Sequence, residues 1–358
     1  MDKNTIIGFV LIAAVLFGYS WFTKPTPEQL QELQRRNDSI AQVEQKKLEE
    51  IQQSQMVAGN ADSTITVLNE DSLRQVQMKE AFGIFSDFTT GENEKINLKN
   101  DLVSLSFSSK GGALTEATLN KYKTHDSLPL TLFDEKDNEY GFIFKTGGRI
   151  VNTTDLFFKP IAGKDGKSVT MRLDFGNGKF FDLVYTLPED SYMVKMDIRQ
   201  KGMETILPGN TASLDLFWNQ NLRSQEKGHM FEERNSALYY KFVGSDVDHL
   251  SESKDEQETI SLGLKWIGYK NQFFSSALIP DGKFNGALIR SGMNNDPAYL
   301  KNFHTETTVD YNPADNNGPG FRFYLGPNLY PLLHSYDKGV DDDKALDLDK
   351  LVPLGFKF

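Results

Sequence analysis

The chain has 358 residues, enough for two or three domains, and 39% of its residues are hydrophobic, which excludes wholesale disorder. Its net charge of −11 argues against a nucleic-acid-binding surface. The absence of cysteine excludes disulfides, thiolate metal sites and cysteine catalysis. A mean hydropathy of −0.46 does not fit a protein with many membrane helices.

The first segment, residues 6–22, is uncharged and reads IIGFVLIAAVLFGYSWF. Its length is at the short end of the range for a membrane-spanning helix. Tyr19 and Trp21 stand where interfacial aromatic residues belong, and no small-residue cleavage site follows them. We therefore predict an uncleaved membrane anchor over residues 1–23, whose orientation the flanking charges do not decide. The predicted anchor residues include Ile6, Phe9, Leu11, Leu16, Trp21 and Phe22.

Residues 24–80 are predicted to form a helical and flexible tether. Pro25 and Pro27 open this stretch, and a thin, interrupted apolar stripe at helical spacing then predicts one solvated helix rather than a coiled coil. From Gln52 to about Met78 the sequence becomes polar and unpatterned, which favours a flexible linker. A partner-binding helix is the alternative for this stretch.

A β-rich body begins at about Glu94, where hydrophobic and polar residues start to alternate. The alternation is clear in Val103–Ser108 and in residues 192–198, and it is typical of half-buried antiparallel strands. Residues 174–179, DFGNGK, read as a hairpin turn. Because no long helical pattern interrupts the strands, we predict a large antiparallel sandwich over residues 81–340, followed by a tail over 341–358.

Three later segments depart from the simple strand pattern. Ser245–Glu258 is acidic and polar, which predicts an exposed loop. Trp266–Pro280 is apolar and aromatic and fits either a pair of strands or a short helix. Asn328 is a candidate N-cap for a short helix that ends near Tyr336.

Motifs for chemistry are missing or incomplete. Gly166-Lys167-Ser168 resembles the end of a phosphate-binding loop, but Ile161 stands where the motif requires its first glycine. His304 and Glu306 alternate along one strand without a visible further metal ligand, and Asp341–Asp343 lacks the spacing of a calcium loop. We therefore predict no catalytic residue, no metal site and no cofactor.

Three strings, in this order after an anchor, resemble one family. They are LVSLSFSSKGGAL at 102–114, WIGYKNQFFSSALIP at 266–280 and YLGPN at 324–328. With the N-terminal segment they are similar to the amino-terminal half of the YidC family of bacterial membrane-protein insertases. The resemblance implies a cytoplasmic N-terminus and a large periplasmic domain in the bacterial inner membrane. It also implies a β-supersandwich like that of galactose mutarotases, with a short C-terminal helix. Residues 341–358 would lead back to the membrane, and the family's insertase core is absent from these residues.

The resemblance also implies a function and a set of site residues. The chain would be a non-enzymatic part of an insertase and chaperone, assisting the insertion and folding of inner-membrane proteins. Its implied partners are the lipid bilayer, the Sec translocon with its accessory subunits, and nascent inner-membrane proteins. Gly111, Gly112, Gly326 and Pro327 match structural turns of the family. The aromatic residues that match are expected either to pack in the core or to line a cleft or partner patch. They include Trp266, Tyr269, Phe273 and Phe274.

Two other functions stay open. A mutarotase-like, membrane-anchored enzyme or sugar-binding protein would need a carboxylate and a histidine that face one sugar oxygen, and the five scattered histidines do not predict such a pair. A generic periplasmic scaffold would instead bind its partner through the tether helix.

Overall fold

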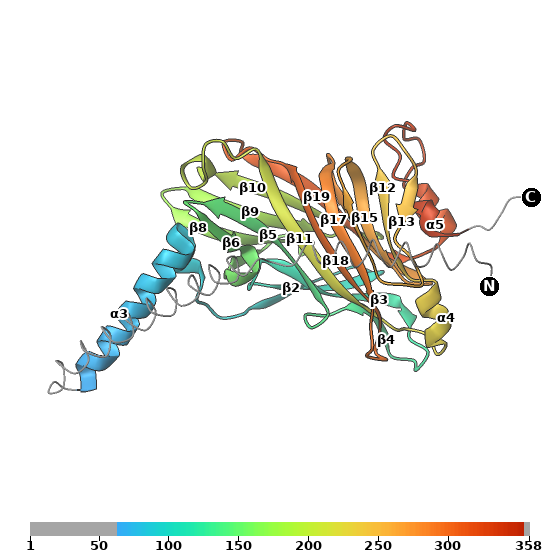
Figure 1. The fold of residues 1–358 in the computed structure, drawn as a ribbon, viewed down its shortest axis with the longest axis horizontal. Coiled ribbons are helices and arrows are strands. Elements are labelled where there is room, and N and C mark those ends of the chain that lie inside the picture. Colours follow the sequence, from blue (N-terminus) through green and yellow to red (C-terminus); the bar gives the residue numbers. More distant parts are fainter. Residues whose placement is uncertain (1–62, 354–358) are drawn as a thin grey trace, which may run out of the picture. The chain divides into compact units, whose positions relative to one another are not determined.

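Antiparallel β-strands make up most of the structure. The computed structural model describes residues 63–353, and Figure 1 shows its elements. The predicted anchor, residues 1–23, and the tether up to residue 62 lie outside the described residues. Within residues 63–353, no helix combines the length and the apolar character that a membrane crossing requires. Every strand pairing in this range is antiparallel, so the fold class predicted from the alternation is confirmed at that level.

The first described helix, α3, spans Ser63–Phe82 and corrects one prediction. A flexible linker was expected to about Met78, but residues 63–82 are helical. They contain neither glycine nor proline and are rich in good helix formers such as Leu, Gln and Glu. Its side chains are exposed from residue 72 to residue 81. Because this part of the helix buries no face, the sequence shows no apolar stripe that would predict it. The boundary between the chain's two compact units, Met1–Leu73 and Arg74–Phe358, falls within this helix.

Among residues 63–353 the strands form two sheets. The smaller has four strands in sequence order: β1 (Lys95–Lys99), β2 (Val103–Ser108), β3 (Ala113–Lys123) and β4 (Pro129–Phe133). The larger contains β5 (Asn138–Thr146), β6 (Arg149–Asn152), β7 (Lys159–Ala162), β8 (Ser168–Gly176), β9 (Lys179–Thr186), β10 (Met193–Lys201), β11 (Ser213–Arg223), β12 (Ala237–Phe242), β13 (Val247–His249), β14 (Glu256–Ile260), β15 (Leu264–Lys270), β16 (Phe274–Pro280), β17 (Phe284–Met293), β18 (Tyr299–Asp310) and β19 (Asn317–Pro327).

Short helices connect these strands. They are the 3-10 helices η1 (Gly83–Phe88), η2 (Thr153–Asp155), η3 (Met203–Thr205) and η4 (Leu348–Leu351), and the α-helices α4 (His229–Arg234) and α5 (Tyr330–Ser335).

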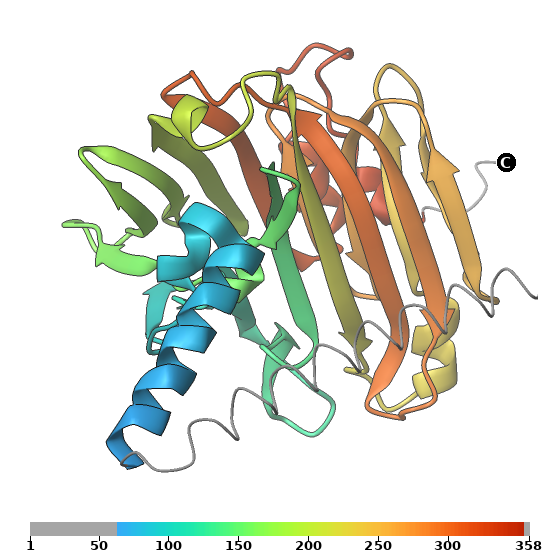
Figure 2. The same cartoon turned by 60° about the vertical axis from the view of Figure 1, so that its left-hand side comes forward.

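The larger sheet folds back on itself to make two layers. Its strand order along the main path is β6-β5-β11-β18-β17-β15-β16-β19-β10-β9-β8-β7, and Figure 2 shows the long strands running side by side. Although β5 lies far from β19 and β9 in this order, Tyr140 on β5 contacts Phe323 on β19, with ring centroids 5.2 Å apart. Phe144 on β5 likewise packs at 5.0 Å against Phe181 on β9. The aromatic core therefore lies between two layers of one bent sheet.

The predicted hairpin over residues 174–179 is present, and a segment left open in the sequence also forms a strand pair. Gly176 pairs with Lys179 at the end of β8 and β9, and both Asn177 and Gly178 have positive φ, as a tight Asn-Gly turn requires. The apolar segment 266–280, which fitted either strands or a helix, forms the antiparallel pair β15–β16.

The prediction of a loop over Ser245–Glu258 is wrong at both ends. Residues Val247–His249 form β13, which pairs with β12, and Glu256 begins β14, which pairs with β17. Most of their side chains face solvent, and each strand packs one apolar residue, Val247 or Ile260, against the core. Polar composition could not separate such exposed strands from a loop.

Gly111 and Gly112 form the tight turn between β2 and β3, and both have positive φ. The Tyr185 hydroxyl donates to the carbonyl of Gly112 at 2.9 Å, and the Tyr140 hydroxyl accepts from the backbone N–H of Leu114 at 2.9 Å. The two hydroxyls lie 2.6 Å apart. This buried pair of tyrosines therefore fastens the turn of the smaller sheet to strands β5 and β9 of the larger one.

A substitution at Gly112 tests this turn. A Cβ atom there would lie 2.9 Å from Cγ of Phe158, in addition to the strain of φ +61°. We expect Gly112→Ala to lower the free energy of unfolding by about 3 kcal/mol in urea denaturation. Gly111→Ala is the matched control, because φ there is +82° but the nearest atom would lie at an ordinary 3.5 Å. Its expected cost is about 1 kcal/mol, and equal losses in the two variants would contradict this explanation.

Candidate functional site

The four aromatic residues expected in a cleft or partner patch occupy strands β15 and β16 and the turn between them. Trp266, Tyr269 and Phe274 are buried, whereas Phe273 in the turn exposes 45% of its surface. The Trp266 indole donates to the carbonyl of Leu346 at 2.6 Å. The Tyr269 hydroxyl is 2.8 Å from Thr305 Oγ1, within the core. Phe273 is therefore the one member of this set that a partner can reach directly.

Gly326 and Pro327 lie at the end of β19, beside the same turn. Pro327 pairs with Phe274, and Gly326 pairs with Ser275. A Cβ atom on Gly326 would lie 2.9 Å from both Tyr192 Cγ and the Tyr324 hydroxyl, so the close approach of these tyrosines requires glycine. Helix α5 begins three residues after Pro327.

Asn328 does not cap helix α5, which corrects a second prediction. The helix begins at Tyr330, and its N-cap position is Leu329, without a side-chain cap. The Asn328 amide instead donates to the carbonyl of Asn271 at 3.0 Å, and its oxygen accepts from Ser275 Oγ at 2.6 Å. Asn328 thus fixes the β15–β16 turn to the end of β19.

A buried carboxylate connects this turn to a further segment. Glu232 on α4 is fully buried. It accepts from the backbone N–H groups of Gln225 and Glu226 at 3.0–3.1 Å, from Ser224 Oγ at 3.0 Å and from Asn271 Nδ2 at 3.1 Å. A buried charge is tolerated only when it is bonded in this way.

Gln225 extends the same network to the hairpin between β3 and β4. Its side-chain amide donates to the carbonyl of Thr131 at 2.8 Å, and its own carbonyl accepts from the backbone N–H of His125 at 3.2 Å. We call Glu232, Gln225, Asn271 and Asn328 the Glu232 hub. It ties together the β3–β4 hairpin, the segment leading into α4, the β15–β16 turn and the β19–α5 junction, four segments far apart in the sequence. Figure 1 shows α4 beside the ends of β3 and β4.

Each of the four segments displays at least one large apolar side chain to solvent. Their exposed fractions range from 45% to 64%. We call this set the end face; it consists of Leu128, Met230, Phe231, Phe273 and Leu329. Phe231 and Phe273 are the only phenylalanines among residues 72–353 that are strongly exposed. Exposed apolar groups on segments that one network holds together mark an interaction surface more strongly than scattered ones do.

Lys270, at the end of β15, is a second buried ionisable group near α4. Its ammonium donates to the carbonyl of Asn235 at 2.8 Å, just beyond the end of that helix. Burial lowers the pKa of Lys270 to about 8. The cation also lies 5.4 Å from the ring centre of Tyr239. Helix α4 is therefore held by the buried carboxylate of Glu232 within it and by the ammonium group of Lys270 just beyond its last residue.

Two hollows lie elsewhere, on either side of β11. One of about 520 Å³ is lined by residues of β3, β5 and β11, and one of about 620 Å³ by residues of β11, β17 and β18. Asn219 and Asn221 border both. His304 and Glu306 are hydrogen-bonded at 2.8 Å on β18, and of the two only His304 lines the second hollow. This geometry does not supply the opposed acid and base of a mutarotase.

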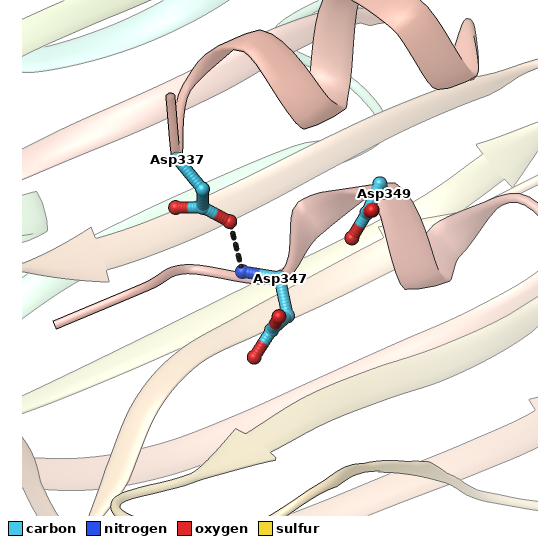
Figure 3. Close-up of side chains that lie close together, drawn as sticks. All are labelled: Asp337, Asp347 and Asp349. Carbon is cyan, nitrogen blue, oxygen red and sulfur yellow. Dashed lines mark hydrogen bonds between the residues drawn. The ribbon is translucent and has the colours of Figure 1, made fainter. Parts of the chain in front are cut away.

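Three aspartates near the C-terminal end come together, as Figure 3 shows, with one oxygen of each within 4.8 Å of the others. Each carboxylate already has a partner. Asp337 accepts from the backbone N–H groups of Leu346 and Asp347 at 2.6 and 2.7 Å. Asp349 pairs with His334 at 3.0 Å, and Asp347 pairs with Lys241 at 2.5 Å. The cluster therefore fixes η4 against α5, and its geometry is explained by these contacts.

Removal of the Glu232 carboxylate should loosen the whole end of the domain. Glu232→Ala leaves the buried N–H groups of Gln225 and Glu226 and the amide of Asn271 without their acceptor. We expect the free energy of unfolding in urea to fall by about 3 kcal/mol. Glu233→Ala, the neighbouring change outside the hub, should cost less than about 0.5 kcal/mol. Similar losses for the two variants would show that the hub does not stabilise the domain.

The hub should also give stability a defined pH dependence. Burial raises the pKa of Glu232 above its ordinary value of 4.5, and the hydrogen bonds only partly offset this. The folded protein therefore holds the proton to a higher pH than the unfolded chain does, and raising the pH through this window lowers the free energy of unfolding. The difference in unfolding free energy, wild type minus Glu232→Gln, should decrease as the pH rises through and above the ordinary glutamate pKa of 4.5. A difference that rises with pH would contradict the assignment.

Comparison with known proteins places these features in context. The family model described as "YidC periplasmic domain" matches residues 95–358. A "Membrane protein insertase YidC" from Parabacteroides distasonis is 44% identical over 357 residues, which are 99% of this chain and 56% of that protein. The chain thus spans about half the length of the curated relatives it matches.

Two solved structures are more distant. The crystal structure of YidC from Thermotoga maritima is 14% identical and has a TM-score of 0.35 over 73% of this chain and 55% of that one. A galactose mutarotase related enzyme from Lactobacillus acidophilus is 9% identical and has a TM-score of 0.42 over 65% of this chain and 97% of that one.

Proposed function

The chain belongs to the YidC periplasmic-domain family, and we propose that it serves as the membrane anchor and periplasmic domain of an insertase. In this proposal it assists the insertion and folding of inner-membrane proteins together with the Sec translocon. The observation that carries the proposal is the match of the family model to residues 95–358, together with 44% identity along almost the whole chain to a protein named as a membrane protein insertase.

The proposed organisation follows the chain. Residues 1–23 anchor the protein in the inner membrane with the N-terminus in the cytoplasm, and residues 24–80 form the tether. Residues 81–340 form the periplasmic domain, a β-supersandwich related to the galactose mutarotases, and residues 341–358 lead back to the membrane. The two layers of antiparallel strands, joined through β15, support the sandwich part of this proposal.

The contribution of this half is positioning and partner contact rather than bond chemistry. His304 is hydrogen-bonded to Glu306 on the same strand, and Glu306 does not line the hollow that His304 lines, which supports a non-enzymatic role. Among the sequence-derived candidates for a partner patch, Phe273 is the accessible side chain, whereas Trp266, Tyr269 and Phe274 build the core beneath it.

Complementation tests this assignment. In a bacterium depleted of its own insertase, residues 1–358 alone should not restore growth or membrane insertion of a reporter protein, because positioning without an insertase core cannot perform insertion. The full-length relative from Parabacteroides distasonis, expressed to the same level, is the positive control. Rescue by residues 1–358 alone would overturn the assignment of this half to an accessory role.

A further inference from the structure

The end face lies on the side of the domain where the described chain ends. Leu329, one of its members, immediately precedes helix α5. Helix α5 in turn packs against η4, the last described element, through His334 and Asp349 at 3.0 Å. If residues 341–358 lead to the membrane, as the proposed function holds, then the end face lies on the membrane-proximal side of the domain.

The charges of the two segments that carry Leu128, Met230 and Phe231 suit a lipid surface. Over residues 121–128 and 226–234 the exposed basic side chains outnumber the exposed acidic ones, although the whole chain has a net charge of −11. The exposed basic side chains are Lys121, Lys123, Lys227 and Arg234. Asp126 is the exposed acidic residue of these two segments, and Glu226 and Glu233 are half-buried. Basic residues flanking apolar side chains favour the interface of an anionic bilayer.

The Glu232 hub gives this surface a fixed shape. The turn that carries Phe273 is bonded to Asn328 through the Phe273 carbonyl and the Asn328 N–H at 2.6 Å. Met230 and Phe231 lie on the six-residue helix α4, and the buried carboxylate of Glu232 on the same helix holds it in place. Buried aromatic residues lie next to the exposed ones in the same turn. Phe274, for example, packs there against Tyr122 with ring centroids 5.2 Å apart.

From these observations we propose that the end face is a membrane-docking surface: Phe231, Phe273, Met230, Leu128 and Leu329 enter the interfacial region of the bilayer. The surrounding lysines and Arg234 contact anionic headgroups. This inference rests on the proposed function, because it takes the side where the chain leaves the domain to be the side of the membrane. Docking would hold the domain in one orientation above the bilayer, instead of leaving it free at the end of its tether.

Depth-dependent fluorescence quenching tests the proposal on the full chain. Because the chain has no cysteine, single cysteines can be introduced and labelled with an environment-sensitive NBD probe. The labelled chain is reconstituted into vesicles of phosphatidylethanolamine and phosphatidylglycerol that contain nitroxide-labelled lipid. Probes at Phe231→Cys and Phe273→Cys should be quenched about threefold more than control probes.

Two matched controls lie away from the end face. Ile150 on β6 is 70% exposed, and Leu262, before the opposite end of β15, is 66% exposed. A second variant, Phe231→Asp in the Phe273→Cys background, should reduce quenching at position 273 to the level of these controls. Near-UV circular dichroism checks that the fold is retained, which is expected because Phe231 is exposed.

A probe at Phe9→Cys, in the predicted anchor, separates the two levels of the proposal. Quenching at position 9 without quenching at 231 and 273 would overturn the docking surface and leave the anchor in place. No quenching at position 9 or at positions 231 and 273 would overturn the proposed anchor and the docking surface together. Equal quenching at all domain positions would also overturn the docking surface. Probe self-quenching that grows with the protein-to-lipid ratio, in place of quenching by lipid, would overturn it in favour of a second copy of the chain as the partner.

Discussion

The buried carboxylate of Glu232 is the interaction on which one end of this domain depends. Loops and turns have no ladder of strand hydrogen bonds, so their buried backbone groups must find partners elsewhere. Glu232 supplies an acceptor to three donors from residues 224–226 and to the amide of Asn271. Because each of these groups would otherwise be buried without a partner, the cost of breaking the hub is high, and the four segments it joins behave as one unit.

Aromatic packing contacts connect the region of the Glu232 hub to the two sheets. Tyr122 on β3 packs against Phe274, and Tyr324 on β19 packs edge-on against Tyr336 at 5.9 Å. Burial raises the pKa of Tyr336 to about 12, so this hydroxyl stays neutral throughout the physiological range. Further along the sandwich, the pair Tyr140 and Tyr185 fastens the turn at Gly112 to both layers. Aromatic contacts and tyrosine hydrogen bonds therefore both connect the smaller sheet to the larger one.

The alternation of residues was sufficient to predict the strands that are half-buried, such as Val103–Ser108, because a period of two leaves a clear mark when one face is apolar. It failed where both faces are exposed, as in β13, and where a helix is exposed all round, as in the described part of α3 from residue 72. Asn328 was predicted to cap the short helix, and that prediction is wrong. Its partners lie in the β15–β16 turn, more than fifty residues away, and capping rules that use only neighbouring residues cannot predict such contacts.

The candidate site was predictable only in part for the same reason. The aromatic segment 266–280 pointed to the right turn, but the sequence does not tell which of its rings face the core, and Trp266, Tyr269 and Phe274 do so. Glu232 carries no motif, since a glutamate in a short polar stretch normally faces solvent. Its role arises from contacts between segments that only the folded chain brings together.

The chain belongs to the YidC periplasmic-domain family, and its Glu232 hub joins four segments that each expose a large apolar side chain. The central physical claim is that one carboxylate holds these segments together. Hydrogen–deuterium exchange on Glu232→Gln tests it most directly. The account predicts faster exchange at the amides of Gln225 and Glu226 and, in the same variant, at Asn328, while the β8–β9 hairpin stays as protected as in the unaltered chain. Faster exchange confined to residues 225 and 226, with Asn328 unchanged, would contradict it.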